Sequence, residues 1–404
     1  MPDISRTKKT LTVSYREKTV GTLAEMENKK IAFSYAPEWI ETGFSLNPFS
    51  LPLKEGVFIP KKSHFYGLFG VFADSLPDAW GTLLTDRFLA QKGIAHENLS
   101  SLDRLSLIGD SGMGALCYHP SQEYSIITEV TDFDRLAQEC RELLQSKENP
   151  VEDLDTIYKL GGTSGGARPK IMTDLDGKSW IIKFPAHVDR KNIGEMEYDY
   201  SICAKACGIC MTETKLFPSK LCSGYFGTVR FDRISDRTNE GTDARSPDTK
   251  QKAGKSGSIV RNHVLTAAAL LETNYEEPAL DYHSLMKLTR LLTGECREDI
   301  ENMYLRMCFN VLAHNRDDHA KNFSYLYDAA NNRFRLAPAY DLTYSNTYYG
   351  EHTTSVDGNG RNPGEREILK VGTTAGISKK RCQELFEQVK GCVEEKLKKY
   401  LRNC

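Results

Sequence analysis

The densest group of polar side chains is the run NRDDHAKN at residues 315–322. It follows an apolar segment, NMYLRMCFNVL, which we expect to form a buried helix ending near Leu312. Asp317 precedes Asn322 by five residues, with His319 between them. Phosphoryl transfer requires a carboxylate that orients the attacking hydroxyl and a nearby oxygen ligand for Mg²⁺, and one Asp-x-x-x-x-Asn loop contains both. By itself the run is equally compatible with a capped surface turn, and we interpret His319 as a packing anchor of the loop rather than as the base.

A further acidic residue follows this run after a predicted hairpin. The segments FSYLYD and RFRLAPAYD alternate as strands do, flank a turn at Asn331-Asn332, and end at Asp341. A carboxylate just past a hairpin beside the catalytic loop is well placed to bind Mg²⁺. We therefore predict that Asn322 and Asp341 bind the metal.

A lysine upstream has the surroundings expected of a nucleotide-binding lysine. Lys183 lies among apolar residues in SWIIKFP, and a lysine within a buried strand is costly unless a carboxylate pairs with it. The next predicted helix opens with Glu195 and Glu197. We favour Glu197 as the partner, because Glu195 lies nearer the helix N-terminus, where the helix dipole already stabilises a carboxylate. The alternative is that Lys183 is an exposed lysine on an edge strand.

A glycine-rich segment, GGTSGGARPK, precedes this strand at residues 161–170. Glycine lets backbone N–H groups approach phosphate oxygens, and concave turns of this kind bind anions. The segment matches neither G-x-G-x-x-G nor the P-loop pattern, and glycine-rich turns are common. Its position just before the Lys183 hairpin is what favours a phosphate-binding role.

The composition is that of an ordinary globular protein. Of 404 residues, 40% are hydrophobic and 27% are charged, which disfavours a disordered or fibrous chain. The formal net charge of −2 gives no global basic field for nucleic acid. The 11 cysteines include a single C-x-x-C motif, and we interpret them as buried small side chains in a reducing cytosol. No apolar signal core occurs, so we expect a cytoplasmic protein without a membrane segment.

Hydrophobic periodicity predicts the elements that position these residues. Strands are indicated between residues 10 and 60, in a hairpin around Asp176-Gly177 and at 225–233, and helices at 78–90, 131–149, 195–209 and 378–401. Thr131 or Asp132 is the expected N-cap of the second helix. The polar stretch 146–155 is the candidate domain boundary, and residues 234–258, which hold almost nothing apolar, are expected to form a loop. We expect the apolar stripe of 378–401 to pack in the core rather than to form a partner groove.

Together these motifs resemble the HipA family of bacterial serine/threonine kinases, the toxins of HipBA-type toxin–antitoxin modules. The kinase part is similar at GGTSGGARPK, WIIKFP, NRDDHAKNF and PAYDL, and the N-terminal part at FADSLPDAWGTLLTDRF and LDRLSLIGDSGMGAL. The resemblance runs over most of the length and implies an α+β fold of the two-lobed, protein-kinase-like kind. It implies an N-terminal β-rich subdomain with connecting helices at 1–150, a small lobe at 151–235, and a mainly helical C-terminal lobe at 236–404.

The resemblance also implies roles for individual residues. Asp317 would be the catalytic base, Lys183 would contact the α- and β-phosphates of ATP while Glu197 holds it, and Asn322 and Asp341 would bind Mg²⁺. Val229 to Phe231 would lie at the adenine, and Asp232 near the ribose. The remaining ATP-binding positions would be in the glycine and catalytic loops: Gly161, Gly162, Thr163, Ser164, Gly165, Gly166 and His319.

In this family a serine of the phosphate loop can be autophosphorylated, which ejects the loop and switches the kinase off. Here that position falls on Thr163 or Ser164. A phosphate, with a charge of about −2, would repel ATP from the loop. The expected partners are a protein substrate with a serine or threonine hydroxyl and a HipB-like helix-turn-helix antitoxin, with DNA contacted through the antitoxin.

Two other functions are compatible with the sequence. One is a nucleotide-binding corepressor scaffold that acts with a helix-turn-helix antitoxin on operator DNA, although the presence of every catalytic position favours an active kinase. The other is a kinase that acts on a small molecule.

Overall fold

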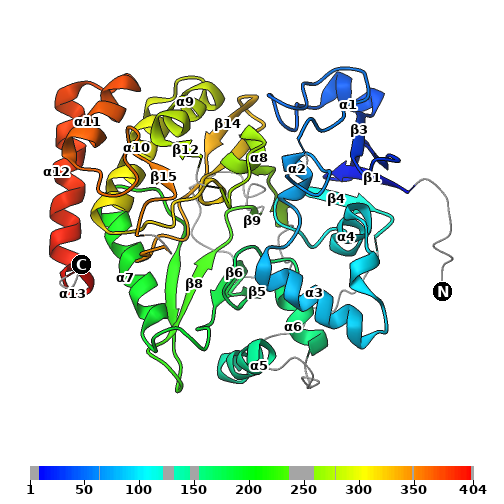
Figure 1. Ribbon diagram of the computed structural model, residues 1–404, viewed down its shortest axis with the longest axis horizontal. Helices are drawn as coiled ribbons and strands as arrows, with labels where there is room; N and C mark the ends of the chain where they lie inside the picture. The colour runs from blue at the N-terminus through cyan, green and yellow to red at the C-terminus, as the bar shows by residue number, and fades with distance from the viewer. Residues whose placement is uncertain are drawn as a thin grey trace, which may run out of the picture.

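The structure is a computed structural model that describes residues 9–62, 64–121, 132–145, 154–235, 259–277, 279–347 and 350–401. Figure 1 shows the N-terminal region at one side of the molecule and the last helices at the opposite side, with the middle of the chain between them. Most of the predicted boundary stretch, 146–155, and most of the predicted loop, 234–258, lie outside the described residues.

The N-terminal region is built on an antiparallel sheet in the order β3-β2-β1-β4. Its strands are β1 (Thr10–Tyr15), β2 (Lys18–Glu25), β3 (Ile31–Tyr35) and β4 (Leu116–His119). Val13, Val20 and Leu23 are fully buried in this sheet, and the strands confirm the β-structure predicted for this part of the chain.

Several short helices complete this region, and one of them interrupts the stretch predicted as strand. They are α1 (Pro37–Thr42), α2 (Gly70–Ala73), η1 (His96–Asn98) and α4 (Ser101–Ile108). The helix α1 forms because Pro37 at its start already has a helical φ and Trp39 buries one face.

The small lobe contains a second antiparallel sheet, in the order β5-β6-β8-β7. Its strands are β5 (Lys170–Leu175), β6 (Lys178–Lys183), β7 (Thr214–Phe217) and β8 (Tyr225–Val229). Asp176 and Gly177 both have positive φ and form the predicted hairpin turn. The helix α7 (Ile193–Ala206) follows, and Gly208 adopts a positive φ just beyond its end.

The strand predicted at 225–233 is shorter than expected. It ends at Val229, and the chain turns at Phe231 and Asp232 before β9 (Arg233–Ser235) pairs with β10 (Ile259–Arg261). The break occurs because the carboxylate of Asp232 is drawn into a buried cluster of arginines, described below.

Three helices pack on this second sheet: α3 (Ala79–Gln91), α5 (Phe133–Gln145) and α6 (Leu154–Gly161). Asp132 is the N-cap of α5, because its carboxylate accepts a hydrogen bond from the backbone N–H of Arg135 at 3.0 Å. The helices and the sheet share one hydrophobic core, which includes Trp80, Leu84, Phe88, Cys140, Ile157, Trp180 and Ile182. This core crosses residue 150, so the N-terminal part of the chain helps to build the small lobe.

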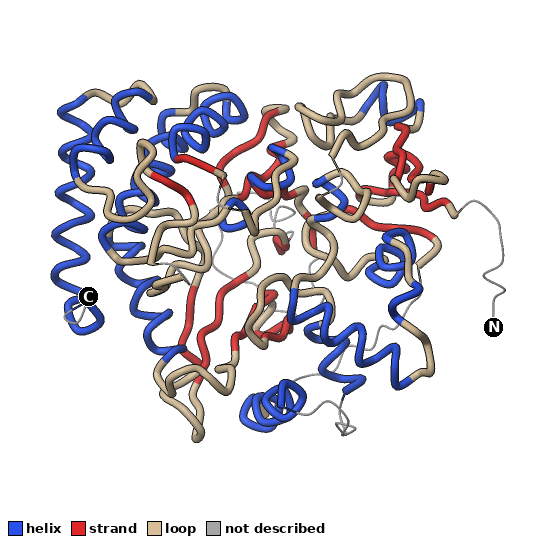
Figure 2. Tube along the Cα trace, viewed as in Figure 1, coloured by secondary structure: helices blue, strands red, loops and turns tan. Residues whose placement is uncertain are grey.

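The C-terminal lobe is mainly helical around a small sheet in the order β11-β13-β14. Its strands are β11 (Val264–Thr266), β13 (Ser324–Asp328) and β14 (Arg333–Leu336), and β12 (Leu280–Asp281) pairs separately with β15 (Thr354–Ser355). Its helices are α8 (Ala267–Leu271), α9 (Tyr282–Thr293), α10 (Arg297–Leu312), η2 (Ala320–Asn322), α11 (Glu365–Thr374), α12 (Lys379–Lys396) and α13 (Lys398–Leu401). Figure 2 shows these helices gathered beside the strands of the centre.

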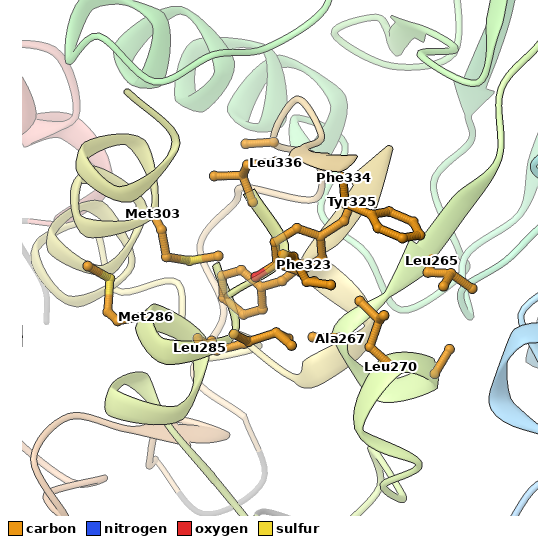
Figure 3. Close-up of a cluster of buried hydrophobic side chains, with 14 of the residues drawn as sticks. Leu265, Ala267, Leu270, Leu285, Met286, Met303, Phe323, Tyr325, Phe334 and Leu336 are labelled. Carbon is orange, nitrogen blue, oxygen red and sulfur yellow. The ribbon is translucent and has the colours of Figure 1, made fainter. Parts of the chain in front are cut away.

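The core of this lobe surrounds Tyr325 of β13. Figure 3 shows Leu285 and Met286 of α9, Met303 of α10 and Phe334 of β14 around it. The hydroxyl of the buried Tyr325 bonds with the Thr289 hydroxyl at 2.8 Å, so the polar atom is satisfied inside the core. This packing holds the two strands that lie in the chain between the loop of residues 315–322 and Asp341.

The predicted stripe of the last long helix is part of the core. Leu385, Val389 and Val393 of α12 are buried, and α12 packs against α7 and α10. Every described cysteine is a free thiol. Among the helices of the described ranges, we find none that is both long and apolar enough to cross a membrane.

Candidate active site

The ammonium group of Lys183 lies at the end of β6 between two carboxylates. Its Nζ is 2.5 Å from Oε1 of Glu197 and also contacts Oδ1 of Asp341. The exposed fractions of the Lys183 and Glu197 side chains are 13% and 4%. Burial alone would lower the pKa of Lys183, but Asp341 and Glu197 outweigh it and raise the pKa above its ordinary value. Lys183 is therefore a buried cation held in one place.

This arrangement confirms the predicted pairing of Lys183 with Glu197. Glu195 instead lies 3.6 Å from the ammonium of Lys399 at the surface. The strand β6 lies between β5 and β8, so Lys183 is not on an edge strand.

The position of Glu197 depends on a close approach between α7 and the sheet. A Cβ atom at Gly194 would collide with the carbonyl oxygen of Gly224, next to the start of β8. Only glycine allows α7 to pack at this distance. Glu197, one turn later on α7, is thereby brought within reach of the ammonium group of Lys183.

Asp341 lies beyond β14 in a left-handed backbone conformation, with φ of 53°. Burial would raise the pKa of its carboxyl, but the ammonium groups of Lys183 and Lys170 outweigh that effect and hold the pKa below its ordinary value. Its side chain keeps an exposed fraction of 38%. Asp341 is therefore an ionised carboxylate that an incoming ligand can still reach.

The loop of residues 315–322, predicted to be the catalytic loop, presents Asp317 toward solvent. The exposed fraction of the Asp317 side chain is 56%, and its Oδ1 is 3.8 Å from Nε2 of His319. The side-chain amide of Asn322 donates a hydrogen bond to the carbonyl oxygen of Asp317 at 2.7 Å, which closes the loop. His319 packs its ring 5.5 Å from that of Tyr275, in keeping with the predicted packing role.

The neighbouring aspartate, Asp318, has a different task that the sequence did not reveal. Its buried carboxylate accepts hydrogen bonds from the hydroxyl of Tyr282 at 2.9 Å and from the backbone N–H of Thr354 at 3.1 Å. Nδ1 of His352 lies 2.9 Å from the same carboxylate. Asp318 thus anchors the loop to the protein interior, while Asp317 is exposed to solvent.

Oxygen atoms of Asn322 and Asp341 fit the preferences of Mg²⁺. Asn322 uses its amide nitrogen within the loop, which leaves its amide oxygen as the ligand atom. Within the described residues, no group of three His, Cys, Asp or Glu side chains could hold a metal ion. Asn322 and Asp341 could hold Mg²⁺, which commonly binds through one or two protein ligands together with phosphate oxygens.

The glycine loop begins at the end of α6. The backbone N–H of Gly162 donates to the Tyr158 carbonyl oxygen at 2.7 Å, and the buried Ser164 hydroxyl donates to the Gly161 carbonyl oxygen at 2.6 Å. The half-buried Thr163 donates to the Ser111 carbonyl oxygen at 3.2 Å. The structure thus separates two hydroxyls that the sequence could not rank.

Lys170, at the start of β5, is a site residue that sequence reasoning missed. Its side chain is buried and its Nζ donates to the carbonyl oxygen of Gly165 in the glycine loop. Burial and the nearby ammonium of Lys183 lower the pKa of Lys170 to about 8. The signal available in the sequence was a lysine that directly joins the glycine segment to an apolar strand.

The residues predicted to meet adenine and ribose lie at the end of β8 and in the turn that follows it, which we call the hinge (residues 229–232). Val229 ends β8, and the half-buried ring of Phe231 stacks on Tyr340 with ring centres 5.6 Å apart. Asp232 is fully buried, and its carboxylate accepts bonds from Arg230 and Arg233. The backbone N–H of Gly114 also donates to it at 2.8 Å. The Asp232 side chain has an exposed fraction of 0%, so a ribose hydroxyl cannot reach it in the described conformation, and the predicted contact with ribose is not supported.

Two family models match the chain. Residues 162–397 match the HipA-like C-terminal domain, and residues 11–119 match the HipA N-terminal domain. The chain belongs to the HipA family. This confirms the resemblance found in the sequence and the α+β, kinase-like fold.

A solved structure has a similar fold. It is a chain of the complex of the toxin–antitoxin system HipA, HipB and its operator DNA from Shewanella oneidensis MR-1, with a TM-score of 0.64 and 17% identity over 94% of this chain and 88% of that one. A second solved structure, the proinflammatory kinase CtkA of Helicobacter pylori, matches at 11% identity over 57% of this chain and 91% of that one, with a TM-score of 0.35.

Proposed function

We propose that this HipA-family chain is a Mg²⁺- and ATP-dependent protein kinase that acts on serine or threonine hydroxyls as the toxin of a toxin–antitoxin module. The observation that carries the proposal is the buried Lys183, held between Glu197 and Asp341 and assembled with the loop of Asp317 and Asn322. A fixed cation, an exposed carboxylate and two oxygen ligands are the groups that phosphoryl transfer needs.

Each group has a defined task in this proposal. Asp317 accepts or orients the hydroxyl proton of the substrate, and its exposed position lets a protein hydroxyl reach it. Lys183 neutralises charge on the α- and β-phosphates, while Glu197 keeps its side chain in place. Asn322 and Asp341 would hold Mg²⁺, which supplies compensation for charge on the phosphate oxygens.

Autophosphorylation in the glycine loop would have different consequences at its two hydroxyls. The Ser164 hydroxyl is buried and bonded within the loop, so a phosphate there is incompatible with the described loop conformation. A phosphate on Thr163 would break only the contact with the Ser111 carbonyl oxygen. We therefore assign loop ejection to Ser164, reached when the loop opens.

We extend the proposal to a HipB-like helix-turn-helix antitoxin as the partner, with DNA bound through that antitoxin. The support is the similar fold of the chain from the Shewanella oneidensis complex, which contains HipB and operator DNA. Copurification with a small helix-turn-helix protein from the same module would support this partnership, and failure of the pair to associate would contradict it.

Mass spectrometry after incubation with Mg-ATP tests the proposed protein kinase activity. We expect phosphate on Ser164 or Thr163 of the wild-type chain, because a kinase that modifies its own loop must act on a protein hydroxyl. A Ser164→Ala, Thr163→Val double variant is the control for site assignment. ATP consumption that requires an added small molecule and leaves every protein hydroxyl unmodified would favour a small-molecule kinase, and ATP binding without any transfer would favour the corepressor scaffold.

A further inference from the structure

The first turn of α3, which belongs to the N-terminal part of the chain, lies directly on the glycine loop. The backbone N–H of Trp80 donates to the Gly166 carbonyl oxygen at 3.2 Å, and its indole Nε1 donates to the Lys170 carbonyl oxygen at 3.0 Å. A Cβ atom at Gly81 would be 2.8 Å from the Ser164 carbonyl oxygen, which is too close for any other residue type. The helix and the loop are therefore in contact without a gap.

Asp78, the residue before α3, joins two loops of the candidate active site. Its Oδ2 accepts a hydrogen bond from the backbone N–H of Gly166 at 2.8 Å, and its Oδ1 contacts Nζ of Lys321. Gly166 has a φ of 82°, a conformation that favours glycine and directs its N–H toward the carboxylate. Lys321 belongs to η2, between Asp317 and Asn322. One carboxylate thus connects the glycine loop to the catalytic loop.

Lys321 is held as an ammonium ion on the other side of this contact. Burial would lower the pKa of Lys321, but the carboxylates of Asp78 and Asp74 raise it above its ordinary value. Its Nζ also lies 4.8 Å from the centre of the Tyr275 ring. The side chains of Lys321 and Asp78 keep exposed fractions of only 18% and 19%, so their contact is an ion pair in a mostly enclosed setting, which is stronger than a surface ion pair.

We propose that Asp78 is a positioning residue that clamps the glycine loop against the catalytic loop and so fixes where the phosphates lie relative to Asp317. This role rests on the proposed kinase function. The clamp works through charge: the carboxylate accepts from Gly166 and attracts Lys321 at the same time. An amide in its place could still accept one hydrogen bond but would lose the ion pair.

The clamp itself is tested by hydrogen exchange in the nucleotide-free, full-length chain. In Asp78→Asn we expect the amide of Gly166 to exchange about tenfold faster than in the wild type, because a neutral acceptor without its ion pair to Lys321 replaces the charged one. Asp86→Asn is the matched control, since Asp86 lies on the same helix but pairs with Arg104 at 3.3 Å, away from the loop. Equal exchange of Gly166 in all three proteins would overturn the clamp.

Lys321→Met is a second test if Asp78→Asn does not fold. It removes the ion pair of Asp78 from the other partner, and we expect it also to raise the exchange rate of the Gly166 amide. Thermal unfolding of each variant identifies any that are unfolded.

Its role in the kinase is tested by ATP affinity and turnover. We expect the KM for ATP to rise about tenfold in Asp78→Asn and in Lys321→Met, and the double variant to be no worse than either single one, because the residues act as one unit. Independent, additive losses would contradict the clamp, as would a wild-type KM in both single variants. A wild-type chain that binds no ATP at all would contradict the proposed function, and with it the positioning role, even if Gly166 exchanges as expected.

Discussion

Asp341 in the candidate active site and Asp232 at the hinge have similar sequence surroundings but opposite environments. Each follows an aromatic residue, and those two rings, Tyr340 and Phe231, stack on one another. The Asp341 side chain keeps an exposed fraction of 38% and contacts one ammonium group with one oxygen. Asp232 has an exposed fraction of 0%, with both oxygens bonded to arginines. A carboxylate can bind a ligand only if one of its oxygen atoms is accessible. The neighbouring residues in the sequence do not determine that accessibility.

The two aspartates are also ionised for different reasons. Around Asp341, the charges of Lys183 and Lys170 overcome the effect of burial on its pKa. For Asp232, burial is overcome by Arg230 and Arg233, and the pKa falls to about 2. Asp232 is thus a buried ion whose charge is matched by two guanidinium groups, whereas Asp341 keeps exposed surface at which a ligand can reach it.

The largest expected effect comes from Asp341→Asn. We expect the rate of phosphate transfer to fall by about 10²–10³-fold. The substitution removes a proposed ligand of the Mg²⁺ that would compensate charge on the phosphate oxygens. Stability should change little, since Lys183 keeps its contact with Glu197. The transfer rate is measured in a single turnover, and stability is measured by thermal unfolding of the same preparation. Transfer at the wild-type rate would remove Asp341 from the site.

Asp232→Asn should have the opposite profile. We expect the free energy of unfolding to fall by roughly 3–5 kcal/mol, because Arg230 and Arg233 lose their buried partner. ATP affinity of the folded protein should be unchanged. Glu295→Gln, which removes a solvent-exposed partner of Arg290, serves as a control and should leave unfolding unaltered. A loss of ATP affinity without a loss of stability would instead restore the ribose contact predicted from the sequence.

A smaller effect is expected from pH. The pKa of Asp232 is about 2 in the folded protein, below the ordinary value of 3.8. Its ionisation therefore stabilises the fold fully above about pH 4, and this contribution of roughly 2 kcal/mol is lost as the pH falls toward 2. The difference in unfolding free energy between wild type and Asp232→Asn should shrink across that range. A difference that is constant with pH would show that the charge of Asp232 is not what stabilises the hinge.

The parts of the site that the sequence predicted correctly are those set by local geometry. Lys183 could be placed because a strand and hairpin fix its direction, and Glu197 because it opens the following helix. Both lie close together in the chain, 14 residues apart. Short-range periodicity therefore carried enough information to pair them.

The parts that could not be predicted depend on contacts between distant segments. Asp232 is occupied partly by the backbone of Gly114, 118 residues away, and Asp78 meets Lys321 across 243 residues. The pattern predicts a helix at residues 78–90, where the structure has α3, but nothing in that pattern indicates that the first turn of the helix supports the glycine loop. Similarly, only packing distinguishes the anchored Asp318 from the exposed Asp317.

Asp317→Asn tests the central claim most directly, because more than half of this side chain is exposed and the substitution keeps its size. The measurement is phosphate incorporation into protein from Mg-ATP, with ATP affinity and thermal unfolding determined on the same sample. We predict a variant that folds and binds ATP like the wild type but transfers almost no phosphate. Transfer at the wild-type rate by Asp317→Asn would contradict the assignment of this loop as the catalytic centre of a kinase.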